Sequence, residues 1–142
     1  DIPNIVGIKD SSGNVDTLNA YADIAKKKDF CLLVGSDSKI SYAYSIGAVA
    51  AVAGTSNVIV DTLVGLDKAL GEGNTAEAEK LQKDIDVLRG VLGLGTVPSV
   101  MKRATELSGV AQIGPARMPV QKLSAEDDEK IKEMLRYYNL YK

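Results

Sequence analysis

Three short runs of mostly apolar residues stand out in the first 60 positions of the chain. They cover residues 4–9, 30–34 and 48–53, and small or polar residues follow each of them. Continuous apolar runs are typical of strands in a parallel sheet whose two faces are both covered, whereas a strand with one wet face alternates. The pattern therefore predicts three buried parallel strands.

Apolar residues between and after these runs recur at helical spacing. They predict helices over residues 15–28, 38–46 and 58–70, so that strands and helices alternate. Such alternation indicates βαβ units with right-handed crossovers. Two architectures fit this order: part of a (β/α)8 TIM barrel, or a small doubly wound sheet.

The second half of the chain predicts helices only, with start signals of two kinds. Two segments have the form of a capping box, and a third begins with a proline in its first turn, where the missing amide proton costs nothing. The capping segments are 74–77 and 124–127, and the proline-led helix covers 97–107. We therefore divide the chain into a partial TIM barrel of three βα units over residues 1–72 and a C-terminal helical region over residues 73–142.

The composition excludes several kinds of chemistry. The 142 residues include no histidine and one cysteine, Cys31, which we expect to be a small core residue. Histidine zinc sites, Ser-His-Asp triads and Cys-His pairs are thereby excluded, and we expect no metal site. With 17 basic and 19 acidic residues and no basic run, a nucleic-acid partner is not expected. No apolar stretch is long enough to cross a bilayer, so we expect a cytoplasmic protein without membrane contact.

Each predicted strand ends in small or polar residues, at the edge where parallel α/β proteins bind ligands. These segments are Lys9–Ser12, Gly35–Asp37 and Gly54–Asn57. Partial burial of Lys9 at a strand end would favour its neutral amine, the form that attacks a carbonyl to give a Schiff base. Glycine at positions 35 and 54 would let a small substrate approach the backbone. From these residues alone, a solvated lysine beside ordinary loops is the commoner arrangement.

The order and spacing of these segments resemble the dihydrodipicolinate synthase and N-acetylneuraminate lyase family of Schiff-base pyruvate aldolases. Segments 5–13, 33–37 and 47–58 are similar to the sixth, seventh and eighth strands of that family. Segment 97–104 is similar to its proline-led helix, and segment 116–124 to the stretch before its last helix. The resemblance implies the C-terminal part of a TIM barrel, with three βα units like strands 6–8, followed by a helical extension.

The same resemblance implies a pyruvate-dependent lyase or synthase that needs no cofactor. It assigns Lys9 as the catalytic residue that forms an imine with pyruvate or another 2-oxo acid. It also implies that Val52 binds the pyruvate carboxyl region through its backbone, and that other positions contact the rest of the substrate. The implied substrate-binding positions are Ser11, Gly35, Asp37, Val52 and Gly54.

The family also uses a tyrosine on the fifth strand and a Thr or Ser pair on the second, and both would precede residue 1. We therefore expect weak or no turnover by this chain alone, and a partner that is either a second copy or a complementary N-terminal half-barrel. A catalytically silent scaffold that folds and self-associates is the main alternative. A flavodoxin-like sheet that binds phosphate is disfavoured, because the turns at Gly35 and Gly54 lack the spacing of a phosphate loop.

Overall fold

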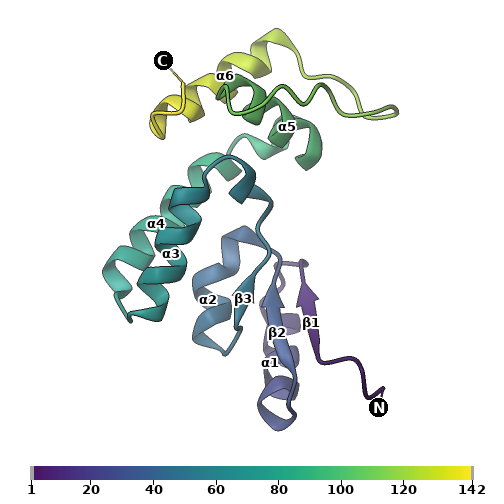
Figure 1. Cartoon of the computed structure of the whole chain (residues 1–142), viewed down its shortest axis with the longest axis vertical. Helices are drawn as coiled ribbons and strands as arrows, with labels where there is room; N and C mark the ends of the chain where they lie inside the picture. The colour runs from purple at the N-terminus through teal and green to yellow at the C-terminus, as the bar shows by residue number, and fades with distance from the viewer. Residues whose placement is uncertain (1, 142) are drawn as a thin grey trace. The chain divides into compact units, whose positions relative to one another are not determined.

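The computed structural model describes residues 2–141, and its strands form one parallel sheet. Strands β1 (Gly7–Asp10), β2 (Cys31–Val34) and β3 (Ala50–Ala51) lie side by side in that order (Figure 1). The predicted set of three parallel strands is confirmed. The strands are shorter than the apolar runs, and β1 extends one residue past Lys9 to Asp10.

The helices alternate with the strands as the apolar spacing predicts. Helix α1 (Val15–Lys27) contacts β1 and β2, and α2 (Ile40–Ser45) contacts β2 after the short 3₁₀ helix η1 (Asp37–Lys39). A second 3₁₀ helix, η2 (Gly54–Asn57), precedes α3 (Val60–Gly71). Local chemistry fixes these boundaries: at the start of α1, for example, the N-cap side chain accepts a hydrogen bond from an amide of the first turn.

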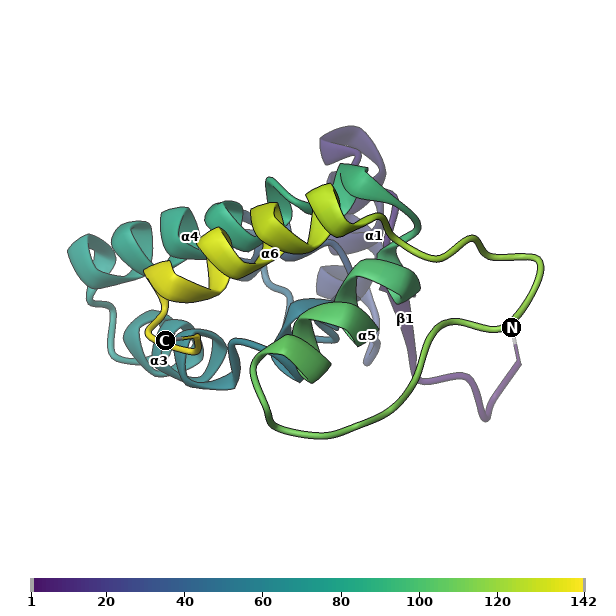
Figure 2. The ribbon, with the colours of Figure 1, turned by 90° about the horizontal axis from the view of Figure 1, so that it is seen from above.

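The remaining elements are helical, as predicted. They are α4 (Thr75–Arg89), η3 (Leu92–Leu94), α5 (Val97–Leu107) and α6 (Ala125–Tyr137). The predicted capping box before α6 is present, with Ser124 and Asp127 each binding the other's backbone amide. A long loop joins α5 to α6. In Figure 2 it runs out from the end of α5, away from both helices, and comes back to the start of α6.

Contacts divide the described residues into two compact units. The first comprises the described residues of Asp1–Gly54 and Gly65–Gln82, and the second those of Thr55–Val64 and Lys83–Lys142. All three strands lie in the first unit. The division at residue 72 stays a prediction. None of the described helices is both long enough and apolar enough to span a bilayer.

One face of the sheet is buried and the other is open. Along β2, Leu32 and Val34 are fully buried, whereas Cys31 is exposed. Val52, which shares a face with Ala50 and Leu33, is 48% exposed. Within this chain the sheet is therefore covered on one face only, whereas the apolar runs are typical of a sheet covered on both. The prediction that Cys31 is a core residue is wrong. Helices α1 and α2 cover only the face that carries Leu32 and Val34.

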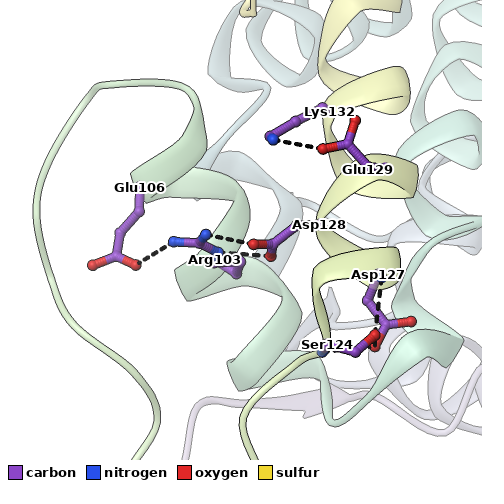
Figure 3. A network of polar contacts seen from close by, with 7 residues as sticks. All are labelled: Arg103, Glu106, Ser124, Asp127, Asp128, Glu129 and Lys132. Carbon is purple, nitrogen blue, oxygen red and sulfur yellow. Dashed lines mark hydrogen bonds and ion pairs between the residues drawn. The ribbon is translucent and has the colours of Figure 1, made fainter.

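A network of charged side chains joins α5 to α6 within the second unit (Figure 3). Arg103 donates to both carboxylate oxygens of Asp128, at 2.7 Å from Nε and 2.5 Å from Nη2, and its Nη1 lies 3.3 Å from Glu106. Glu106 in turn accepts a 2.7 Å bond from the amide of Gly114, in the loop between the two helices. The hydrogen bond from Arg103 lowers the pKa of Asp128 below its ordinary value.

Candidate active site

Lys9 lies on the open face of the sheet, one residue before the end of β1. It pairs with Leu33, which pairs with Ala50, and these three form one cross-strand row. The next row begins with Asp10, which is buried on the opposite face. Lys9 itself is exposed, so the predicted partial burial of its amine is wrong in this chain. The reason is that its row faces away from α1 and α2.

Three of the predicted site residues, Lys9, Ser11 and Gly35, meet where β1 and β2 end. The Gly35 amide donates a 2.6 Å bond to the carbonyl of Asp10. A Cβ at position 35 would lie 3.0 Å from Cε of Lys9 and would overlap Oγ of Ser11. A side chain at position 35 would therefore force the side chains of Ser11 and Lys9 to move aside. The close approach of a substrate to Gly35 stays a prediction.

Two further glycines set the spacing between β1 and β2. A Cβ at Gly7 would stand 2.8 Å from the backbone oxygen of Cys31, which is closer than real Cβ atoms come. Gly13 has a φ of 68°, and a Cβ there would lie 3.1 Å from Oγ of Ser36. Sequence reasoning missed both roles, because each depends on a partner at least 23 positions away, beyond a helix.

A chain of short-range hydrogen bonds fixes the loop that carries Ser11. The buried carboxylate of Asp10 accepts bonds from Oγ of Ser12 at 2.9 Å and from its amide at 3.4 Å. The Ser12 hydroxyl accepts from the amide of Asn14 at 3.1 Å, and Asn14 caps α1 by accepting from Thr17. The end of β1 is thereby tied to the start of α1, which holds Ser11 between two fixed points.

Asp37 begins the 3₁₀ helix that follows β2, and it is only 6% exposed. Its carbonyl accepts a 2.9 Å bond from Nε2 of Gln82 in α4, and Oε1 of Gln82 accepts a 3.0 Å bond from the amide of Ser41. Gln82, which lies in α4, thus holds the loop after β2 through its side chain. Nothing in the sequence signals this role, because the two residues lie 45 positions apart.

Val52 and Gly54 follow β3 and differ in how they are held. The amide of Val52 donates to the carbonyl of Val34 at 2.8 Å, so this N–H serves the sheet. Gly54 is exposed, and a Cβ there would meet no described atom within 4 Å. The Val34 bond places Val52 next to the end of β2, beside Gly35.

The assembled groups suit carbonyl chemistry. An exposed primary amine stands beside a serine at the carboxyl edge of a parallel sheet, and an amine of this kind adds to a ketone once it has lost its proton. Among residues 2–141, no three carboxylate or thiolate side chains gather as metal ligands would.

The fold matches the C-terminal part of a TIM-type α/β barrel, with three parallel strands and flanking helices. The model of the dihydrodipicolinate synthetase family matches residues 1–137. The chain belongs to this family, and the resemblance predicted from its motifs is confirmed.

Individual relatives agree with this assignment. The 4-hydroxy-tetrahydrodipicolinate synthase of Methanosphaerula palustris is 31% identical over 96% of this chain and 47% of its own length. The crystal structure of dihydrodipicolinate synthase from Aquifex aeolicus is 29% identical, with a TM-score of 0.84 over 96% of this chain and 46% of that one. A catalytic lysine mutant of Ruminococcus gnavus sialic acid aldolase is 25% identical, with a TM-score of 0.85 over 94% and 44%. The chain therefore spans about half the length of its relatives.

Proposed function

We propose that this chain supplies the imine-forming lysine of a pyruvate-dependent lyase or synthase, with Lys9 as that lysine. The observation that carries the proposal is the position of Lys9 at the carboxyl edge of the sheet, against Gly35 and Ser11. The similarity to a sialic acid aldolase for which a catalytic lysine mutant exists supports it further. The substrate at Lys9 is pyruvate or another 2-oxo acid.

The reaction follows from amine chemistry. The Lys9 ammonium first loses a proton, and the neutral nitrogen adds to the ketone carbonyl to form a carbinolamine. The carbinolamine oxygen then leaves as water, so that a C=N bond replaces the C=O bond. Loss of a proton from the adjacent carbon gives an enamine, whose carbon attacks an aldehyde. The reverse sequence cleaves the same carbon–carbon bond.

The neighbouring residues have distinct roles in this proposal. Ser11 and Asp37 contact the part of the substrate beyond the imine, and Gly35 and Gly54 contribute backbone to the same region. The backbone of Val52 lies at the carboxyl end of pyruvate. The Val52 amide is engaged with Val34, so the donors that a carboxylate requires have to come from other residues.

We also propose that β1, β2 and β3 correspond to strands 6–8 of a complete barrel, with residues 1–72 as the barrel part and 73–142 as the helical extension. A complete barrel has about 250 residues. Strands β1 and β3 each pair only with β2 among the described residues, and one sheet face is open. A complementary N-terminal half-barrel would cover both edges and that face. Without general acid–base help, worth about 10²–10⁴-fold, the chain alone turns over weakly or not at all.

Borohydride trapping tests the lysine directly. The chain is incubated with pyruvate, reduced, digested and analysed by mass spectrometry, and we expect a stable adduct on Lys9. A Lys9→Met variant should lose the adduct, and a Lys39→Met variant, altered near the same edge, should keep it. An adduct that persists in Lys9→Met, or no adduct in the unaltered chain, would refute the proposal.

A second candidate is a catalytically silent scaffold that self-associates, and the open apolar sheet face favours it. Cys31 on β2 and Val52 after β3 are apolar residues exposed on this face, with Val52 at 48%. Light scattering on the purified chain, alongside the trapping experiment, separates the two candidates. A well-folded oligomer that forms no adduct supports the scaffold, whereas an adduct on Lys9 supports the enzyme in any oligomeric state.

A further inference from the structure

We propose that Gln82 is a positioning residue for the loop after β2, which comprises residues 35–39. Its side chain, which belongs to α4, caps the start of α2. By holding this loop, Gln82 sets how tightly the site binds a 2-oxo acid. The binding consequence rests on the proposed function of Lys9, whereas the capping role stands on geometry alone.

Gln82 satisfies both ends of the turn that leads into α2. Its Oε1 accepts from the Ser41 amide at 3.0 Å, and its Nε2 donates to the Asp37 carbonyl at 2.9 Å. The first turn of any helix leaves amide groups without partners inside the helix, and a local side chain usually accepts from one of them. Neither η1 nor α2 has such a local side-chain cap. Gln82 takes over that task for α2, which has only six residues.

Gln82 is well placed to hold a loop, because its own segment of α4 is anchored. The preceding residue, Leu81, packs against α3 so closely that a Cβ at Gly65 would lie 3.3 Å from its Cδ1. Ala78, one turn earlier in α4, is buried. The amide of Gln82 therefore extends from a fixed backbone, and both of its hydrogen bonds are partly shielded from solvent.

The loop that Gln82 holds reaches Lys9 in one further step. Gly35 begins this loop, and a Cβ at this position would meet Cε of Lys9 and the side chain of Ser11. Asp37, whose carbonyl Gln82 binds, follows two residues later. Loss of the Gln82 side chain would remove this bond to the Asp37 carbonyl while leaving Lys9 and its strand intact. The expected effect is therefore on substrate capture and not on the reactivity of the amine.

Three variants of the full chain test this role. Gln82→Leu removes both hydrogen bonds, Gln82→Glu keeps an acceptor for Ser41 but loses the donor to Asp37, and Lys83→Leu is an exposed control on the same helix. Hydrogen exchange of the Ser41 amide should accelerate about tenfold in Gln82→Leu, because one net hydrogen bond is lost. It should change little in Gln82→Glu and in the control.

Borohydride trapping of Lys9 at a series of pyruvate concentrations measures the effect of each variant on substrate binding. The concentration for half-maximal labelling of Lys9 should rise about fivefold in both Gln82 variants, because both lose the bond to Asp37. The maximal extent of labelling should stay unchanged. A general loss of folding would also lower the maximal extent of labelling. A higher half-maximal concentration with an unchanged maximal extent therefore excludes that explanation.

Each outcome decides one part of the proposal. Unchanged Ser41 exchange in Gln82→Leu would overturn the cap, and faster exchange with unchanged half-saturation would overturn the positioning role. If Gln82→Leu fails to fold, Gln82→Glu carries the half-saturation test. An unaltered chain that forms no adduct would reject the proposed function and with it the binding role, while the exchange rates still decide the cap.

Discussion

Gly35 and Lys9 are packed so closely that an alanine at position 35 would bring its Cβ to 3.0 Å from Cε of the lysine. The same Cβ would overlap the hydroxyl of Ser11. Glycine at this position therefore preserves the path of the Lys9 side chain across the end of β2. The missing side chain of Gly35 thus leaves the space that the side chains of Lys9 and Ser11 occupy.

Replacing Gly35 with alanine should harm both stability and imine formation. The new methyl group has to displace Ser11 and Lys9, whose side chains are exposed and can shift. We therefore expect a cost of about 1 kcal/mol of unfolding free energy, at the low end of the range for overpacked cores. Because the amine moves, Lys9 should be labelled by pyruvate and borohydride about tenfold more slowly, as expected when a reacting group is misplaced. Urea unfolding and the rate of labelling measure the two effects.

Gly71→Ala is the matched control for this change. Gly71 ends α3, has an ordinary φ, and a Cβ there meets no described atom within 4 Å. Its substitution should leave the unfolding free energy and the rate of Lys9 labelling near those of the unaltered chain. Equal behaviour of the two variants would show that the contact between Gly35 and Lys9 does not constrain the site.

Asp10→Ala should loosen the loop that carries Ser11. Asp10 is 8% exposed and accepts two hydrogen bonds from Ser12, and its loss leaves the Ser12 hydroxyl without that partner. We expect a loss of about 1–3 kcal/mol in unfolding free energy. Thermal or urea unfolding measures it, with Asp23→Ala, an exposed acidic residue in α1, as the control. A smaller loss for Asp10→Ala than for Asp23→Ala would contradict this account of the loop.

The elements that could be predicted from the sequence are those whose causes are local. The start of α6, for example, follows from the reciprocal bonds between Ser124 and Asp127, which lie three residues apart. The parallel strands follow from apolar runs between helices, and Lys9, Ser11 and Gly35 come together because parallel strands share one carboxyl edge.

The features that could not be predicted depend on distant partners. Gln82 binds the loop after β2 across 45 positions, and Gly7 is constrained by Cys31 on the neighbouring strand. The burial expected for Lys9 and Cys31 is wrong for a related reason. An apolar run indicates that a strand suits a covered sheet, but whether both faces are covered depends on elements that the run does not specify.

The ion pair between Arg103 and Asp128 should make the second unit sensitive to acid. The pKa of Asp128 lies below its ordinary value of 3.8, chiefly because of the hydrogen bond from Arg103. A carboxyl whose pKa is depressed in the folded state stabilises that state above the unfolded pKa. This stabilisation should be complete at neutral pH and should disappear as the pH falls below about 4 and through the folded pKa.

Unfolding of an Asp128→Asn variant over a pH series checks this dependence. Near pH 7 the variant should be less stable by about 1–2 kcal/mol, since both side chains are partly exposed and the pair is screened. At the acid end of the series the two proteins should converge. Glu129→Gln, which alters an exposed carboxylate on the same helix, is the control. A constant difference at every pH would show that Asp128 acts by packing and not by charge.

Tyr138 should contribute more to the second unit than its neighbour Tyr137. The hydroxyl of Tyr138 donates to the carbonyl of Asp84 and accepts from the amide of Leu88, at 3.1 Å, and thereby joins the end of α6 to α4. Burial raises the pKa of Tyr138 to about 12. Tyr137 is 55% exposed and donates only to the side chain of Asp84. We expect Tyr138→Phe to lose about 1 kcal/mol of unfolding free energy and Tyr137→Phe clearly less.

Urea unfolding of the two phenylalanine variants measures this difference, and an alkaline titration adds an independent check. A tyrosine whose pKa is raised in the folded state stabilises that state fully below its unfolded pKa and loses the effect as the pH rises through about 12. The difference between Tyr138→Phe and the unaltered chain should therefore persist at pH 9 and shrink at strongly alkaline pH. If Tyr137→Phe is the more damaging variant, the exposed bond to Asp84 joins α6 to α4, and the buried hydroxyl of Tyr138 does not.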